Sequence, residues 1–166
     1  MALLDLVFRY RTLLGKCELA IGLSFDEIEE MGDLEAIFEA TESCLEQHRR
    51  RRFRRSPVAM AALLRGARYN DHVKITQLGA GGFECRNAPY VEEGSLVEVV
   101  IDVEDHSYRF SARAVWLRDD GADYRVAFAF EGIPVLVQGV QPGMRKPAVE
   151  HNKLMETIYQ QLSAAA

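Results

Sequence analysis

Residues 108–116 read YRFSARAVW and residues 124–130 read YRVAFAF, and these two stretches decide the fold. In both, apolar side chains alternate with polar or small ones, which is the two-residue period of a strand with one buried face. Between them, Asp119-Asp120-Gly121 favours a tight turn. We therefore predict a β-hairpin here.

More strands are expected on the N-terminal side of this hairpin. Val97, Val99, Ile101 and Val103 alternate with polar residues, and a polar turn, Glu104-Asp105-His106-Ser107, follows them. Residues 96–130 thus predict a meander of three strands. Three further short strands are expected near residues 59–64, 73–78 and 83–86. A closed or nearly closed antiparallel barrel of about six strands accounts for this pattern, so the fold class is mainly β with helical extensions.

The N-terminal part has the period of helices instead. Residues 3–21 carry apolar side chains at three- and four-residue steps, and Gly22 is a plausible end for this helix. Ser24 and Glu27 have the spacing of a capping box, which predicts that a second helix begins there and continues to about His48. Such an αα-hairpin must bury its apolar stripe against the barrel or against another subunit, and we expect a homodimer.

The C-terminal part divides into a loop and a helix. Prolines and glycines predict a loop after the barrel; they are Pro134, Gly139, Pro142, Gly143 and Pro147. A helix is predicted over residues 149–162 from the spacing of Val149, Leu154, Met155, Ile158, Tyr159 and Leu162. The expected organisation is a helical hairpin for interaction or dimerisation over residues 1–48, a barrel over 49–135, and a loop with a helix over 136–166.

Composition and motifs exclude several classes of protein. Hydrophobic residues make up 48% and charged residues 27% of the chain, which is typical of folded globular proteins rather than of disordered or membrane proteins. No apolar run approaches the roughly 20 residues that cross a bilayer, and residues 1–7 do not resemble a secretory signal. We therefore expect a cytoplasmic protein without membrane insertion.

Metal and catalytic chemistry have little support in the sequence. The three cysteines and four histidines are scattered at wide spacings, so we expect neither a disulfide framework nor a metal site. The motifs of serine hydrolases, phosphate-binding loops and zinc proteases are missing. Glu104, Asp105 and His106 lie together, but at a polar turn they would be solvated and poorly suited to acid–base catalysis. We expect a protein that is not an enzyme.

One segment, called the arginine segment below, carries so much positive charge that it favours binding of an anion. Residues 48–55 read HRRRRFRR, which places six arginines in one octapeptide of a chain whose net charge is −5. Guanidinium groups are permanently charged and donate paired hydrogen bonds to phosphate, so this segment could clamp a phosphorylated ligand. A solvated linker, a surface for an acidic partner and a nucleic-acid-binding arm would look the same in sequence. The acidic net charge counts against nucleic acid, and no specific nucleic-acid partner is expected.

The order of these elements resembles the PilZ domain family. Its pattern is an Arg-x-x-x-Arg element before a strand, an Asp/Asn-x-Ser-x-x-Gly turn, and a barrel with a late Val-Trp strand and an aromatic closing strand. Here residues 51–58 look like the first element and residues 77–83 occupy the place of the second, while Ala114-Val115-Trp116 and residues 124–130 are similar to the last two core strands.

The resemblance implies a ligand and its site. Arg51 and Arg55 would contact the phosphates and a guanine face of cyclic di-GMP, commonly an intercalated dimer of it, with Arg50 or Arg54 assisting. In the second motif Gln77 stands where the family has Asp or Asn, Gly79 stands where it has Ser, and Gly82 matches. No other cofactor is implied. The stretch Gly79-Ala80-Gly81-Gly82 is also explained as a tight turn that requires positive φ angles. Forming a turn and contacting a ligand are compatible roles.

Two functions follow from the resemblance. In the first, cyclic di-GMP orders the arginine segment against the barrel and changes how the helices pack or dock on a protein partner. In the second, the altered motif, with Gln77 and Gly79, belongs to an interaction adaptor that no longer binds nucleotide. A nucleic-acid adaptor that uses the arginine run is a third class, and its binding would fall steeply with salt.

Overall fold

The structure, a computed structural model, describes residues 3–39 and 53–138. Its elements in chain order are α1 (Leu3–Glu18), α2 (Phe25–Phe38), β1 (Ser56–Arg65), β2 (Asn70–Gly79), β3 (Gly82–Ala88), β4 (Leu96–Val103), β5 (His106–Asp119) and β6 (Tyr124–Gln138). Two helices and six strands over these residues confirm the predicted fold class for the described part of the chain.

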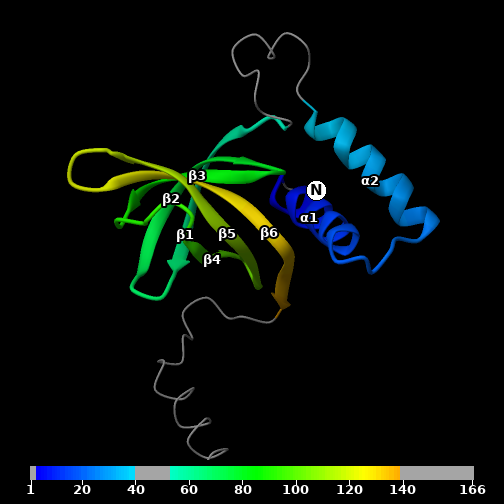
Figure 1. The fold of residues 1–166 in the computed structure, drawn as a ribbon. Helices are drawn as coiled ribbons and strands as arrows, with labels where there is room; N and C mark the ends of the chain where they lie inside the picture. The colour runs from blue at the N-terminus through cyan, green and yellow to red at the C-terminus, as the bar shows by residue number, and fades with distance from the viewer. Residues whose placement is uncertain (1–2, 40–52, 139–166) are drawn as a thin grey trace, which may run out of the picture.

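The six strands form one closed antiparallel barrel in the order β1-β2-β3-β6-β5-β4 (Figure 1). The predicted meander is confirmed, since β4 pairs with β5 and β5 with β6. Closure depends on β1 and β4, which pair only through Leu63–Arg65 and Glu98–Val100. Large side chains fill the interior, among them Phe83, Phe110 and Phe128.

The structure corrects the loop predicted to begin at Pro134, because β6 continues through this residue to Gln138. The register shifts here: Ser111 pairs with Glu131, whereas Arg109 pairs with Val135, so Pro134 falls in a bulge. A proline has no N–H to donate to the ladder, and a bulge is one of the few places in a sheet that accept it.

Both helices are found near the predicted positions, with one correction. Ser24 caps α2, and its capping box with Glu27 is complete, as predicted. However, α2 ends at Phe38 and not at His48, because Glu39 is extended and forms an isolated bridge with Phe53. Residues 40–48 lie outside the described part of the chain, as does the helix predicted over residues 149–162.

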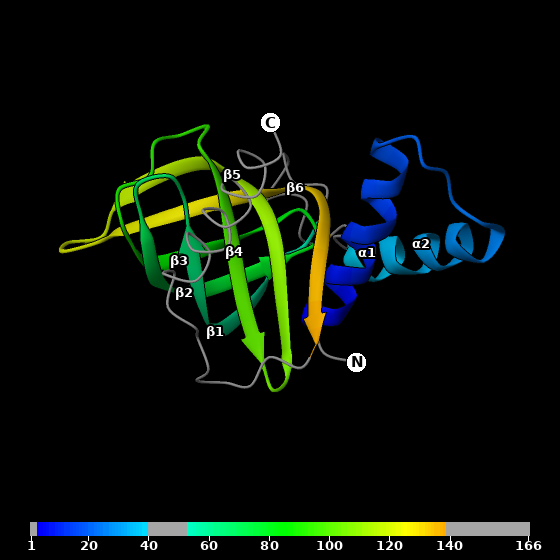
Figure 2. The same cartoon turned by 90° about the horizontal axis from the view of Figure 1, so that it is seen from below.

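Helix α1 lies between the barrel and α2, as Figures 1 and 2 show. Phe8 of α1 packs edge-on against Tyr108 and Phe110 of β5, with ring centroids 5.6 and 6.3 Å apart. One continuous cluster of buried residues includes side chains from α1, α2 and the barrel. The apolar stripe of the helical hairpin is thus buried at least in part against the barrel of the same chain.

Neither described helix has the length and apolar character needed to span a membrane. In the described residues, no group of three or more metal-ligating side chains is close enough to hold an ion. Cys17 is exposed and Cys85 is buried, and both are free thiols. Burial raises the pKa of the Cys85 thiol to about 12. The boundaries predicted at residues 48 and 135 stay predictions.

Candidate ligand-binding site

The end of the arginine segment lies against the β2–β3 hairpin. Ser56 pairs with Leu78 and Pro57 with Gln77, so Arg54 and Arg55 are brought beside the last residue of β2. The Arg54 side chain is exposed and that of Arg55 is half-buried. Two parts of the chain that were singled out separately in the sequence therefore form one surface.

Gly79 makes this close approach possible. A Cβ atom at this position would lie 2.5 Å from the carbonyl oxygen of Arg54 and 3.2 Å from Cγ of Arg55. Distances under 3.0 Å to a backbone atom are essentially never observed for a Cβ, so any side chain here would move the arginine backbone. Glycine at position 79 is explained by packing against the arginine segment.

Gly82 has a different neighbour on the other side of the hairpin. It pairs with Gly79 across the hairpin and with Ala129 of β6. Its φ is +152°, and a Cβ here would lie 2.0 Å from the carbonyl oxygen of Phe128. Gly82 thus needs to be glycine for the close packing of β3 on β6. The predicted positive φ is confirmed for Gly82 but not for Gly79, and the contact of both glycines with a ligand stays a prediction.

The arginine segment is also connected to the helices. The backbone N–H of Arg54 donates a hydrogen bond of 3.0 Å to the carbonyl oxygen of Phe38, the last residue of α2. The ring of Phe53 packs edge-on against Tyr10 of α1, with centroids 5.3 Å apart. A change in the position of residues 53–55 would therefore act directly on both helices.

The predicted site residues divide into two groups. Arg54, Arg55, Gln77, Gly79 and Gly82 lie together at this end of β1, β2 and β3. Arg50 and Arg51 lie outside the described residues. The site is therefore described in part, and the binding roles of all seven residues stay predictions.

Comparison with known proteins gives the family. The PilZ domain family matches residues 49–138, which is more than half of the chain. This chain belongs to the PilZ family. No curated protein sequence matches it.

Three solved structures are similar to this PilZ chain. The inhibitor of motility MotI/DgrA from Bacillus subtilis has 15% identity and a TM-score of 0.44, over 69% of this chain and 52% of its own. MrkH from K. pneumonia in its apo state has 17% identity and a TM-score of 0.40, over 53% and 37% of the two chains. A second crystal structure of MrkH has 16% identity and a TM-score of 0.40, over 68% and 42%. The chain spans about half or less of the length of these proteins.

The PilZ barrel places further side chains beside the predicted site. Four residues form one row across strands β2, β3, β6 and β5, because each pairs with the next; they are Gln77, Glu84, Ala127 and Trp116. The two middle residues are buried, and Gln77 and Trp116 at the ends are half-buried. Trp116 is half-exposed, and the guanidinium of Arg118 lies 5.0 Å from its ring centroid. The row gives the site a polar end at Gln77 and an aromatic end at Trp116.

Glu84 of this row forms an ion pair with Arg125 that was not predicted from the sequence. Glu84 is buried, with 3% of its surface exposed, and its Oε1 accepts a hydrogen bond of 2.7 Å from Nε of Arg125. Nη2 of Arg125 lies 2.6 Å from the same oxygen and completes the ion pair. The hydroxyl of Thr76 also lies 3.4 Å from the Glu84 carboxylate. An acidic residue between two buried apolar neighbours, Phe83 and Cys85, was the available signal.

The acid–base set considered in the sequence lies elsewhere. Glu104 has a φ of +53° in the β4–β5 turn. His106 Nδ1 lies 2.6 Å from Asp105, whose side chain is 69% exposed. Glu104 and Asp105 are exposed in the expected turn, whereas His106 is half-buried and is the first residue of β5.

Proposed function

We propose that this PilZ chain is a non-catalytic, cytoplasmic regulator that binds cyclic di-GMP and controls a protein partner. The observation that carries the proposal is the packing of Arg54 and Arg55 on Gly79, which unites the basic element and the glycine hairpin in one site. Cyclic di-GMP is the ligand that the family resemblance implies.

The chemistry of the site suits such a ligand. Two phosphates and two flat guanines can accept paired hydrogen bonds from guanidinium groups and stack on them. Arg54 is exposed beside Arg55, and the preceding arginines, Arg50 and Arg51, would complete the clamp. Gln77, which is half-buried, offers an amide to a guanine edge.

The contacts of residues 53–55 connect the proposed ligand site to the two helices. Ligand that pulls Arg54 and Arg55 outward would strain the hydrogen bond from Arg54 to Phe38 and the packing of Phe53 on Tyr10. Both contacts hold the helices, and a switch needs such contacts to differ between its two states. The helical hairpin is therefore the proposed transmitter, with the partner docked on it.

Calorimetric titration with cyclic di-GMP, with GTP as control ligand, tests the proposal. We expect saturable binding at micromolar or lower concentration. The double substitution Arg51→Ala with Arg55→Ala should abolish it, and Arg68→Ala should leave it unchanged because Arg68 lies exposed at the opposite end of β2. Unchanged affinity in the double variant would overturn the clamp, and no binding by the native chain would overturn the receptor function.

A second candidate is an adaptor that does not bind nucleotide. The observation that favours it is again Gly79: it has no hydroxyl to offer, and the carbonyl of Arg54 occupies the space into which a serine side chain would extend. A lost hydrogen bond to a ligand costs about 0.5–1.5 kcal/mol, which is up to roughly tenfold in affinity. Absence of binding in the titration, with no shift of the melting temperature, would support the adaptor. Light scattering tests the predicted homodimer.

A further inference from the structure

Helix α2 exposes an apolar stripe on the side opposite its buried residue Leu34. Side chains three and four residues apart share one face of a helix. This spacing relates four exposed residues of α2, which we call the apolar stripe; they are Phe25, Ile28, Gly32 and Ala36. Phe25 is 91% and Ile28 is 55% exposed. Large apolar side chains that gather on an exposed surface mark a site of contact with another molecule.

An acidic row runs along α2 beside the apolar stripe. Residues 19–39 include seven acidic residues and no basic one. Two of the seven, Glu27 and Glu30, form ion pairs with α1. Three others are exposed and form no ion pair within the described part of the chain; they are Asp26, Glu29 and Asp33. Like charges three and four residues apart on a helix repel one another, and a basic neighbour would offset this repulsion.

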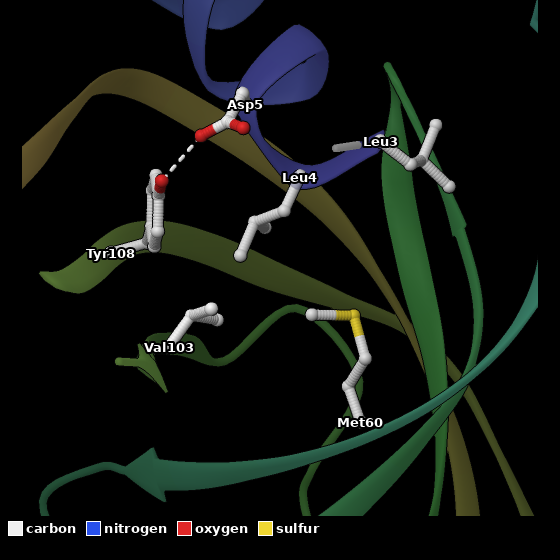
Figure 3. A pocket seen from close by; sticks show the side chains of 6 residues that line it. All are labelled: Leu3, Leu4, Asp5, Met60, Val103 and Tyr108. Atoms are coloured by element: carbon white, nitrogen blue, oxygen red, sulfur yellow. Dashed lines mark hydrogen bonds between the residues drawn. The ribbon is translucent and has the colours of Figure 1, made fainter. Parts of the chain in front are cut away.

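Helix α1 supports α2 and is itself anchored to the barrel. Leu4 of α1 lines one apolar pocket with Met60 and Val103, and Asp5 accepts a hydrogen bond from the hydroxyl of Tyr108 (Figure 3). Because α1 lies between the barrel and α2, the apolar stripe is on the outermost helix of the described fold (Figure 1). A partner could therefore reach it without displacing the barrel.

We propose that the apolar stripe and the acidic row together bind a basic amphipathic helix of the protein partner. Apolar side chains of that helix would cover Phe25 and Ile28, and its lysines or arginines would pair with the acidic row. A Cβ on Gly32 would have no atom within 4 Å, so the partner can approach the backbone of α2 closely there. From Phe25 to Ala36 the stripe extends about 17 Å, which about three turns of a partner helix would cover.

This proposal rests on the proposed function, which makes the helical hairpin the element on which the partner docks. The charge of the α2 surface disfavours other occupants. A second copy would bring two acidic rows together, and like charges facing one another across an interface lower the affinity. An anionic membrane surface and the phosphates of nucleic acid would be repelled for the same reason.

Two designed helical peptides test the proposal on the full chain, without cyclic di-GMP. Both have leucine at the same positions of the helical period, but the polar positions beside the leucines are lysine in one peptide and glutamate in the other. Isoleucine methyl NMR follows binding. We expect the lysine peptide to bind saturably and to shift the signals of Ile28 and Ile37, which are exposed on α2, but not that of Ile75 in the barrel interior. The glutamate peptide should not bind.

A charge reversal locates the contact. Glu29→Lys with Asp33→Lys should weaken binding of the lysine peptide about tenfold or more, and should allow the glutamate peptide to bind. The control is Glu92→Lys with Glu93→Lys, which makes the same change of charge at exposed positions between β3 and β4. This control variant should keep the native affinity for both peptides.

A second double variant tests the apolar stripe. Phe25→Ala with Ile28→Ala should also weaken binding of the lysine peptide about tenfold or more, because large apolar side chains at the centre of a contact contribute most of its affinity. Both residues are exposed, so the variant should keep the fold, and circular dichroism checks this.

Several results would overturn the proposal. Equal binding of the two peptides would show that the acidic row takes no part. Equal weakening by the reversal at Glu92 and Glu93 would show a general attraction to the net charge of the chain. A dimer that the alanine double variant converts to a monomer would assign the stripe to a second copy. Failure of peptide binding with intact binding of cyclic di-GMP would refute the docking surface alone, whereas the opposite pair of results would refute the receptor function and leave the docking surface standing.

Discussion

Gly79 and Gly81 are two residues apart in the same hairpin but have different neighbours. A Cβ at position 79 would press on the carbonyl of Arg54 at 2.5 Å, whereas a Cβ at position 81 would meet only Cδ2 of Phe53 at an ordinary 3.6 Å. Neither residue has a positive φ, so steric contact alone separates them. They form a matched pair for testing the packing of the arginine segment.

We predict that Gly79→Ser destabilises the protein, although serine is the residue that the family pattern has here. Forcing a side chain against backbone typically costs about 1–3 kcal/mol. Gly81→Ala should change the free energy of unfolding by less than about 0.5 kcal/mol, as surface substitutions usually do. Urea denaturation of the two variants checks this, and equal stabilities would contradict the close packing of Arg54 on Gly79.

At the scale of elements, the contact of α1 with β6 depends on a second glycine. A Cβ on Gly15 would lie 2.6 Å from Cγ1 of Ile133 and 3.2 Å from the carbonyl group of Gly132. In α2, by contrast, a Cβ on Gly32 would have no atom within 4 Å. Comparing alanine at Gly15 with alanine at Gly32 therefore measures the free energy that is lost when α1 moves away from β6.

We predict opposite effects of alanine at these positions. Gly32→Ala should stabilise the protein by about 0.5–1 kcal/mol, since alanine loses less conformational entropy than glycine in a helix. Gly15→Ala should destabilise it by about 1–3 kcal/mol, because α1 must shift from β6. Thermal unfolding measures both, and stabilisation by Gly15→Ala would show that α1 does not pack on β6 in this way.

The α1–α2 contact should depend on pH through two ion pairs. The hydrogen bond from Arg9 lowers the pKa of Glu30, and that from Lys16 lowers the pKa of Glu27. A carboxyl group whose pKa is lowered in the folded state contributes its full stabilisation of the fold above its ordinary pKa of about 4.3. This contribution is lost as the pH falls through the lower pKa of the folded state.

The double substitution Glu27→Gln with Glu30→Gln should therefore make stability less dependent on pH below about pH 4.3. The control is Glu29→Gln, at an exposed position between them, which should keep the native pH dependence. Unfolding midpoints measured at several pH values compare the three proteins. A native pH profile in the double variant would show that these pairs do not hold α2 on α1.

At the scale of the whole molecule, the helices and the barrel share one core. Leu4, Val7 and Leu13 of α1 and Leu34 of α2 are buried in the same cluster as the barrel interior. Removing the helices would expose this surface, and apolar burial is the main favourable term in folding. The described residues should thus unfold as one cooperative unit.

We predict that two probes report a single transition in urea. Trp116 is the only tryptophan of the chain and lies on the barrel, while circular dichroism at helical wavelengths follows the helices. Coincident midpoints are the expected result, as in two-state unfolding. Loss of the helical signal at lower urea would show that the helical hairpin is a separate folding unit.

Local features were predictable from the sequence where they depend on neighbouring residues. Alternation gave the six strands, and the spacing of Ser24 and Glu27 gave the capping box, which the structure confirms. The loop at Pro134 and the end of the second helix at His48 were wrong for a common reason. A bulge in a paired strand admits Pro134, and pairing of Glu39 with Phe53 ends α2, and both depend on residues distant in the sequence.

By itself, then, the sequence determined the order of the described helices and strands and the family, and it predicted which residues bind an anion, because periodicity and side-chain chemistry are local properties. Only the tertiary structure decided that Arg54 packs on Gly79, that Glu84 is buried with Arg125, and that β1 and β4 pair over only part of their length. These features depend on strand register and on the path of the barrel, which bring together residues from different strands, and no local pattern specifies such contacts.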